Sequence, residues 1–204
     1  SHYKSEQAVF LIYEGDKNQN GTPDLNEIGV QPLQGDGDFR SEECIELLKE
    51  ADIVVTNPPF SLFREFVTQI DEYKKKCLII GTWNAISYKE VFPLIKNNNL
   101  WIGVNSNRNF TGFIVPEYYP LNGSEARIDD NGNRIVSMNN TCWFTNLDIN
   151  KRHEDLILYK NYSADEYPKY ENYDAIEVSK TAEIPIDYDG IMGVPISFLN
   201  KYNP

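Results

Sequence analysis

The stretch DIVVTNPPF, residues 52–60, decides how the fold of this chain is interpreted. Its first five residues form an apolar run typical of a buried strand, and a helical pattern begins directly after it at Ser61. A strand that stops at a rigid corner and leads into a helix presents that corner at the carboxyl edge of a parallel sheet. Open α/β sheets bind their ligands at this edge. The sequence therefore predicts a ligand-binding corner at residues 57–60.

The residues of this corner have complementary chemistry. Asn57 offers an amide oxygen that can accept a hydrogen bond from an amino group. Pro58 and Pro59 fix the backbone and have no N–H, so the carbonyl groups there are held in place. Phe60 offers a flat face for stacking. Together they predict a cradle for an amino group on a planar ring, and the plain alternative is a generic turn with a core phenylalanine.

The chain around the corner alternates between strand and helix patterns. Apolar strands are expected at residues 53–56, 77–81 and 100–103, and helices at residues 61–75 and 88–96. This β-α-β-α-β alternation is typical of a doubly wound α/β sheet.

The remaining segments are expected to surround this core. Strand patterns before the core predict an added N-terminal β-hairpin, and patterns after it predict antiparallel C-terminal strands. We expect a single domain, residues 1–204, with three parts. These are a hairpin insertion at residues 8–34, an α/β core at residues 35–147 and an irregular C-terminal layer at residues 148–204.

The corner and its flanks resemble a known family. Asp/Asn/Ser-Pro-Pro-Tyr/Phe after a strand is the signature of the amino-methyltransferases, which methylate adenine N6 or cytosine N4 in DNA. The strings GDGDFRSEEC, NPPFSLFREFV, CWFTNL and YDAIEVSK resemble the EcoRI-type adenine-specific DNA methyltransferases, at residues 35–44, 57–67, 142–147 and 173–180. The resemblance covers nearly the whole chain.

The resemblance implies a fold, a reaction and a set of partners. The fold is part of a Rossmann-like, S-adenosylmethionine-dependent methyltransferase sheet. The reaction is site-specific methyl transfer from S-adenosylmethionine to a flipped adenine in double-stranded DNA that carries a short specific site. Phe60 stacks on the adenine, while the Asn57 side chain and the Pro58 carbonyl accept hydrogen bonds from N6. A restriction–modification enzyme of this kind is expected in the cytoplasm of a bacterium or encoded by a phage.

Two further positions match the family or could contact the base. Asp38 and Phe39 resemble the acidic and aromatic residues that contact the adenine of the cofactor, although Gly and Asp are also ordinary in a strand-to-helix turn. Trp143 and Phe144 lie on a predicted strand, where one of them could touch the flipped base. Neighbours on a strand face opposite sides, and core packing is the plain alternative for both.

The polar loop at residues 16–27 matches the twelve-position calcium-loop pattern. Its candidate metal ligands are Asp16, Asn18, Asn20, Asp24 and Glu27. Strand patterns flank the loop where an EF-hand has helices. The alternative is a solvated loop that forms hydrogen bonds with itself.

Charge and missing motifs limit the enzyme interpretation. The net charge of −12 is unfavourable for holding a duplex, because DNA affinity comes mostly from Lys and Arg contacts to phosphate. The glycine loop that binds S-adenosylmethionine in this class is absent from the sequence. We therefore expect a fragment of a longer enzyme that is inactive and binds the cofactor weakly by itself. The alternative function is a non-catalytic nucleic-acid-binding or scaffold module that retains the fold.

The three cysteines have neither disulfide nor zinc spacing, and no apolar run approaches membrane-spanning length.

Overall fold

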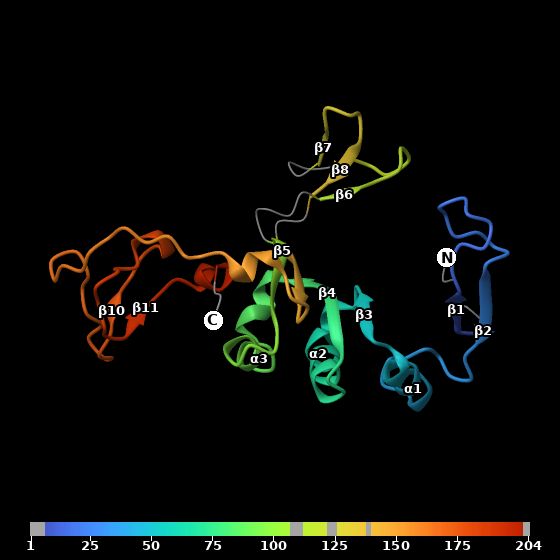
Figure 1. Ribbon diagram of the computed structural model, residues 1–204, viewed down its shortest axis with the longest axis horizontal. Helices are drawn as coiled ribbons and strands as arrows, with labels where there is room; N and C mark the ends of the chain where they lie inside the picture. Colours follow the sequence, from blue (N-terminus) through green and yellow to red (C-terminus); the bar gives the residue numbers. More distant parts are fainter. Residues whose placement is uncertain (1–6, 107–111, 122–125, 138–139, 202–204) are drawn as a thin grey trace. The chain divides into compact units, whose positions relative to one another are not determined.

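The computed structural model describes residues 7–106, 112–121, 126–137 and 140–201 (Figure 1). The chain divides into two compact units, Ser1–Val54 and Val55–Pro204. The expected single domain stays a prediction. Among the described residues, no helix is both long enough and apolar enough to cross a membrane.

The first unit contains two paired strands and one helix. Strand β1 (Val9–Tyr13) pairs antiparallel with β2 (Ile28–Pro32), so that Tyr13 lies opposite Ile28. Helix α1 (Glu42–Glu50) begins after Ser41, whose hydroxyl accepts a hydrogen bond from the Cys44 N–H at 3.2 Å. Ser41 is thus the N-cap of this helix, a position at which serine is strongly preferred.

The second unit is organised around a four-stranded sheet in the order β3-β4-β9-β5. The strands are Ile53–Thr56 (β3), Lys76–Thr82 (β4), Thr141–Thr145 (β9) and Trp101–Ser106 (β5). Strand β9 runs antiparallel to both of its neighbours, β4 and β5. The last of these strands in the sequence therefore lies between two earlier ones, and the fold is mixed α/β as predicted.

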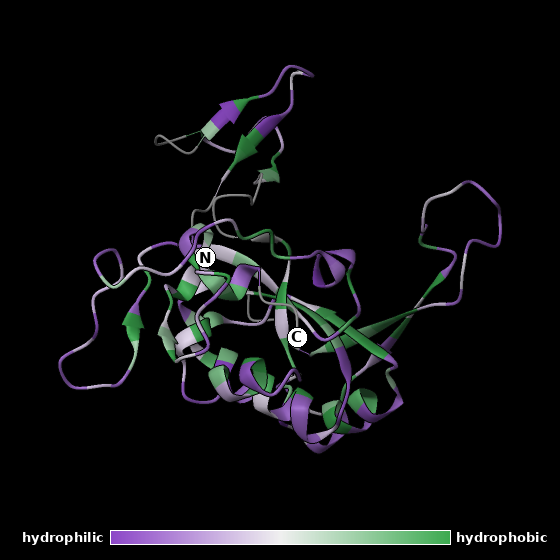
Figure 2. Ribbon diagram, turned by 60° about the vertical axis from the view of Figure 1, so that its left-hand side comes forward, coloured by the Kyte–Doolittle hydropathy of each residue, from purple (hydrophilic) through white to green (hydrophobic). Residues whose placement is uncertain are grey.

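Short helices follow the strands. The turn η1 (Phe60–Leu62) leads directly into α2 (Phe63–Glu72), which buries Phe63, Val67 and Ile70 at helical spacing. Helix α2 is amphipathic, and the helices in Figure 2 carry both hydrophobic and hydrophilic residues.

The predicted helix at residues 88–96 is shorter than expected. After β4 the chain forms η2 (Trp83–Ser87) and then α3 (Phe92–Lys96). Pro93 stands in the first turn of α3, and the Val91 N–H donates to the Tyr88 carbonyl in a turn before it. A proline that fixes φ and lacks an N–H is compatible with a first helical turn and not with a helix interior.

The chain between β5 and β9 forms a small sheet in the order β6-β8-β7. Its strands are Phe113–Ile114 (β6), Ala126–Ile128 (β7) and Arg134–Val136 (β8), all paired antiparallel.

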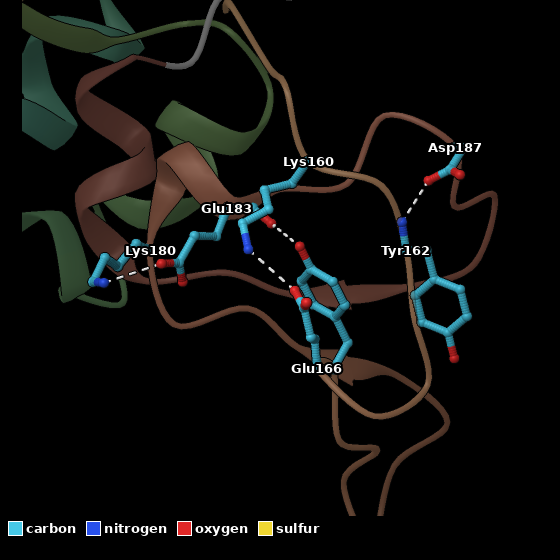
Figure 3. A network of polar contacts seen from close by, with 7 residues as sticks. Lys160, Tyr162, Glu166, Lys180, Glu183 and Asp187 are labelled. Carbon is cyan, nitrogen blue, oxygen red and sulfur yellow. Dashed lines mark hydrogen bonds and ion pairs between the residues drawn. The ribbon is translucent and has the colours of Figure 1, made fainter.

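The segment after β9 has its own small core. It contains η4 (Asn150–His153), the parallel pair β10 (Ile176–Glu177) and β11 (Met192–Gly193), and the turns η5 (Thr181–Glu183) and η6 (Ile196–Asn200). The buried residues of this core are Tyr167, Ile176, Val178 and Ile184. The Tyr167 hydroxyl donates to the Glu183 carbonyl at 2.7 Å. Figure 3 shows Glu183 among the polar contacts of the segment. The structure of this segment therefore depends on side-chain packing and scattered polar contacts more than on helices and strands.

Candidate active site

The corner at residues 57–60 follows β3 and precedes α2, as the sequence predicts. Pro58 is buried, whereas Asn57 and Phe60 are exposed. The Leu62 N–H donates to the Pro59 carbonyl at 2.9 Å, and this bond turns the chain into η1. The turn into the helix therefore uses the Pro59 carbonyl and not the Pro58 carbonyl, which the resemblance assigns to the substrate amine.

A pocket of about 390 Å³ opens at this corner, and all four corner residues line it. Ile80 of β4, Phe113 of β6 and Thr141 of β9 complete the lining. Phe60 and Phe113 are each about two-fifths exposed, at 41% and 38%. The volume lies in the range of small-molecule sites, and the walls combine two aromatic rings with one amide group. Such a pocket fits a planar ring that carries a hydrogen-bond donor.

Strand β9 contributes Thr141 to the pocket, a residue that the sequence did not indicate as functional. Ile80 lies opposite Trp143 and Thr82 lies opposite Thr141, so these side chains share one face of the sheet. Phe144 points to the other face, where it is fully buried against Phe63. Phe144 is therefore a core residue, and Trp143 shares the face of the pocket without lining it.

Asp38 and Phe39, the candidate cofactor contacts, lie in the first unit. Arg40 covers both of them. Its guanidinium donates to the Asp38 carboxylate at 2.9 and 2.6 Å and lies 5.4 Å from the centre of the Phe39 ring. The Arg40 side chain is the main reason that the pKa of Asp38 is lowered to about 2. Both groups thus contact an internal cation in this structure.

The candidate calcium loop satisfies its carboxylates with its own backbone. The Glu27 carboxylate is buried and accepts hydrogen bonds from the N–H groups of Lys17 and Asn18 at 2.7 and 3.2 Å. The Asp16 carboxylate accepts from the N–H groups of Asn20 and Gly21 at 3.1 and 2.7 Å. Within the described ranges, no group of three or more His, Cys, Asp and Glu side chains is arranged to hold a metal ion. Metal binding here stays a prediction, and the geometry favours the self-bonded alternative.

The whole chain, residues 1–204, matches the family described as adenine-specific methyltransferase EcoRI. This chain belongs to that family.

Curated relatives agree with this assignment. The type II methyltransferase M.EcoRI of Escherichia coli is 59% identical over 196 residues, which cover 95% of this chain and 60% of that protein. M.MgeORF184P of Mycoplasma genitalium and M.MpnI of Mycoplasma pneumoniae, also type II methyltransferases, are each 42% identical. Their alignments cover 90% and 89% of this chain and 59% and 58% of those proteins. The chain therefore spans about three-fifths of the length of these relatives. No solved structure matches it.

The pocket of this family member contains three residues that sequence reasoning missed: Ile80, Phe113 and Thr141. Ile80 and Thr141 belong to strand patterns and look like ordinary core residues in the sequence. Phe113 lies in a two-residue strand, which is too short for periodicity to reveal. The strand pairing of β9 with β4 and the pocket itself identify them, and the sequence carries no separate signal for their role.

Proposed function

We propose that this chain is the catalytic-motif part of a site-specific DNA adenine-N6 methyltransferase of the restriction–modification type. The observation that carries the proposal is the pocket in which Asn57, Phe60 and Phe113 meet at the end of β3. Family membership supports the reaction class. The substrate is double-stranded DNA with a short specific site, by analogy with the type II methyltransferases to which the chain is similar.

The four-stranded sheet is proposed to be part of a Rossmann-like methyltransferase sheet. Strands β4 and β5 are both antiparallel to β9, which lies between them, and so they run parallel to each other. The resemblance leads us to expect that the last strand of such a sheet in the sequence is antiparallel. If β3 runs parallel to β4 and β5, as proposed here, the corner lies at the carboxyl edge of the sheet, where α/β proteins bind ligands.

In this mechanism the residues of the corner bind the target adenine, which accepts the methyl group. The target adenine leaves the DNA stack and enters the pocket, where Phe60 stacks on one face of the ring. The Asn57 side-chain oxygen and the Pro58 carbonyl accept hydrogen bonds from the N6 amino group. These acceptors keep electron density on N6, so that its lone pair can attack a methyl carbon. N6 then releases one proton to water, and no covalent bond to the enzyme forms.

When bound, S-adenosylmethionine would supply the methyl group from its sulfonium, and its carbon–sulfur bond would break as the carbon–nitrogen bond formed. Asp38 and Phe39 are the residues proposed to contact the adenine of this cofactor. They do not fit an adenine ring in the present arrangement, because the Arg40 guanidinium binds the Asp38 carboxylate and lies near the Phe39 ring. No step of the mechanism therefore depends on these residues.

The proposal is tested by methylation of duplex DNA with the full-length protein that contains this chain. Asn57→Ala is expected to lower kcat by about 100-fold or more, as loss of one polar group in a catalytic site commonly does. Asn172→Ala, a change of the same kind at an exposed position, is the matched control. Equal methylation by wild type and Asn57→Ala would exclude this mechanism and favour the scaffold alternative.

A further inference from the structure

A second, larger pocket lies beside β5 in the second unit. Its volume is about 870 Å³, compared with about 390 Å³ for the pocket at the corner. Residues of β5, η4, η5 and η6 contribute to its walls, and its polar lining includes Lys151, Thr181 and Lys201. A large pocket with apolar walls and a few converging polar groups is the usual form of a ligand site. The proposed catalytic mechanism makes no use of this pocket.

Lys151 is held inside this pocket by fixed acceptors. Its ammonium group donates to the Asn200 side-chain oxygen at 2.7 Å and to the Gly103 carbonyl of β5 at 3.4 Å. Burial lowers the pKa of Lys151, Glu154 opposes this effect and Lys201 adds to it. An ammonium group has three N–H donors, so two bonds leave one for a ligand. An anion in the pocket would offset both the burial of Lys151 and its repulsion by Lys201.

The two lysines differ from others in the same segment of the chain. Lys160, Lys169 and Lys180 each pair with a carboxylate at 3.0–3.2 Å, and Figure 3 shows two of these ion pairs, with Glu166 and Glu183. Across the part of the chain that the structure describes, neither Lys151 nor Lys201 forms such an ion pair. Within this segment, Lys151 and Lys201 are therefore the lysines whose charge an external anion would balance.

The charge of the pocket indicates which anion fits. Glu154 and Asp155 also line it, so two negative groups accompany the two positive ones. A phosphate dianion would be repelled by these carboxylates more strongly than a singly charged phosphodiester. Thr181 adds a neutral hydroxyl donor. The lining is therefore better matched to a phosphodiester than to free phosphate.

We propose that this pocket binds a phosphodiester group of the DNA backbone through Lys151 and Lys201. The inference rests on the proposed function, because it takes DNA as the substrate. Strand β5 is three strand positions from β3 in the sheet, which is about 15 Å at the usual strand spacing. The contact would position the duplex while the corner holds the flipped adenine.

The test measures DNA affinity as a function of salt concentration for the full-length protein. Lys201→Gln and Lys151→Gln are each expected to weaken binding several-fold and to lower the slope of log K against log salt by about 1. Lys180→Gln removes a lysine that is paired with Glu183 and is the matched control. The kcat at saturating DNA is expected to stay unchanged in Lys180→Gln. Because Lys201 is exposed, its variant keeps the test meaningful if Lys151→Gln fails to fold.

Duplexes with one neutral methylphosphonate linkage locate the contact. The linkage is moved one nucleotide at a time away from the target adenine, and at one position it is expected to weaken binding of the wild type and not of Lys201→Gln. Inorganic phosphate and a free mononucleotide serve as competitors. Competition by either one at submillimolar concentration, with no effect of the neutral linkage, would overturn the DNA assignment.

Two results separate failure of the inference from failure of the proposed function. If the wild type methylates DNA and the salt slopes of all variants are equal, the phosphodiester site is wrong and the enzyme assignment stands. If the wild-type protein neither binds nor methylates DNA, both are wrong.

Discussion

The rings of Phe63 and Phe144 lie 5.2 Å apart and are tilted by 54°, which ties the first residue of α2 to β9 in the middle of the sheet. Both side chains are fully buried. Gly81 of β4 lies against both rings, since a Cβ built there would approach the Phe63 ring at 2.5 Å and the Phe144 ring at 2.9 Å. The corner at residues 57–60 directly precedes this contact, so its position depends on how Phe63 packs.

Gly81→Ala is therefore expected to destabilise the second unit. The added methyl group must displace one of two buried rings, and such overpacking costs about 1–3 kcal/mol. Urea unfolding followed by tryptophan fluorescence measures the change. Gly35→Ala, where nothing lies within 4 Å of the new Cβ, is the control and is expected to stay within about 0.5 kcal/mol of the wild type. Equal stability of both variants would contradict this account of the packing.

The local pattern around the corner was sufficient to predict its place in the fold. An apolar run, two prolines and a helical pattern are signals carried by neighbouring residues, and the N-cap at Ser41 is of the same kind. The lining residues Phe113 and Thr141 were not predictable in this way. Thr141 reaches the pocket because β9 inserts between β4 and β5, and Phe113 reaches it from a two-residue strand. Neighbouring residues in the sequence do not reveal either arrangement.

The assignment of Asp38 to the cofactor stays a prediction. The acidic residue Asp38 was assigned to a cofactor from its position in GDGDFRSEEC, while Arg40 two residues later provides an internal partner. The run at residues 135–147 contains two strands of different sheets, β8 and β9. Continuous strand propensity cannot show where the chain leaves one sheet for another.

The ion pair of Asp38 gives a prediction about pH. The Arg40 guanidinium lowers the pKa of Asp38 to about 2, below the usual value of about 3.9. Stabilisation from this pair is thus present above about pH 4 and is lost as the pH falls towards 2. Arg40→Gln is expected to raise the pKa of Asp38 towards 3.9 in an NMR titration of the carboxyl carbon. An unchanged titration would mean that Arg40 does not hold Asp38 in solution.

The polar loop at residues 16–27 is expected to keep its structure without a metal ion. The Glu27 carboxylate accepts N–H groups of Lys17 and Asn18, so these amides should exchange slowly with solvent. Glu27→Gln replaces charge-assisted bonds, worth about 1.5–3 kcal/mol each, by weaker neutral ones and should speed exchange at both amides. Asn26→Ala, an exposed neighbour, is the control.

The same exchange experiment separates the two interpretations of this loop. Exchange at Lys17 and Asn18 is expected to be equal in millimolar calcium and in excess chelator. A slowing of exchange by calcium alone would show that the loop is a metal site after all, with Glu27 at its bidentate position.

The cysteines differ in their reactivity towards thiol reagents. Burial raises the pKa of Cys77 to about 11 and that of Cys142 to about 12. The thiolate is the reactive form, and these two side chains are also shielded from solvent. Native protein at pH 8 is expected to react with Ellman's reagent only at partly exposed Cys44, and with all three thiols in guanidinium. Mass spectrometry of the labelled peptides identifies the sites, and rapid native labelling of Cys77 or Cys142 would show that the sheet opens easily.

Phe113 is expected to hold the target base from the side of the pocket that β6 provides. It lines the pocket together with Phe60, and stacking of a base on an aromatic side chain is worth about 1–3 kcal/mol. Phe113→Ala should therefore lower kcat/KM for DNA methylation by roughly 5- to 150-fold. Ile114→Ala is the matched control, because this neighbour is 70% exposed and faces the other side of the strand. A duplex with 2-aminopurine at the target position reports base flipping by fluorescence. Loss of activity with an unchanged flipping signal would show that Phe113 acts on another step, and equal activity of both variants would remove it from the site.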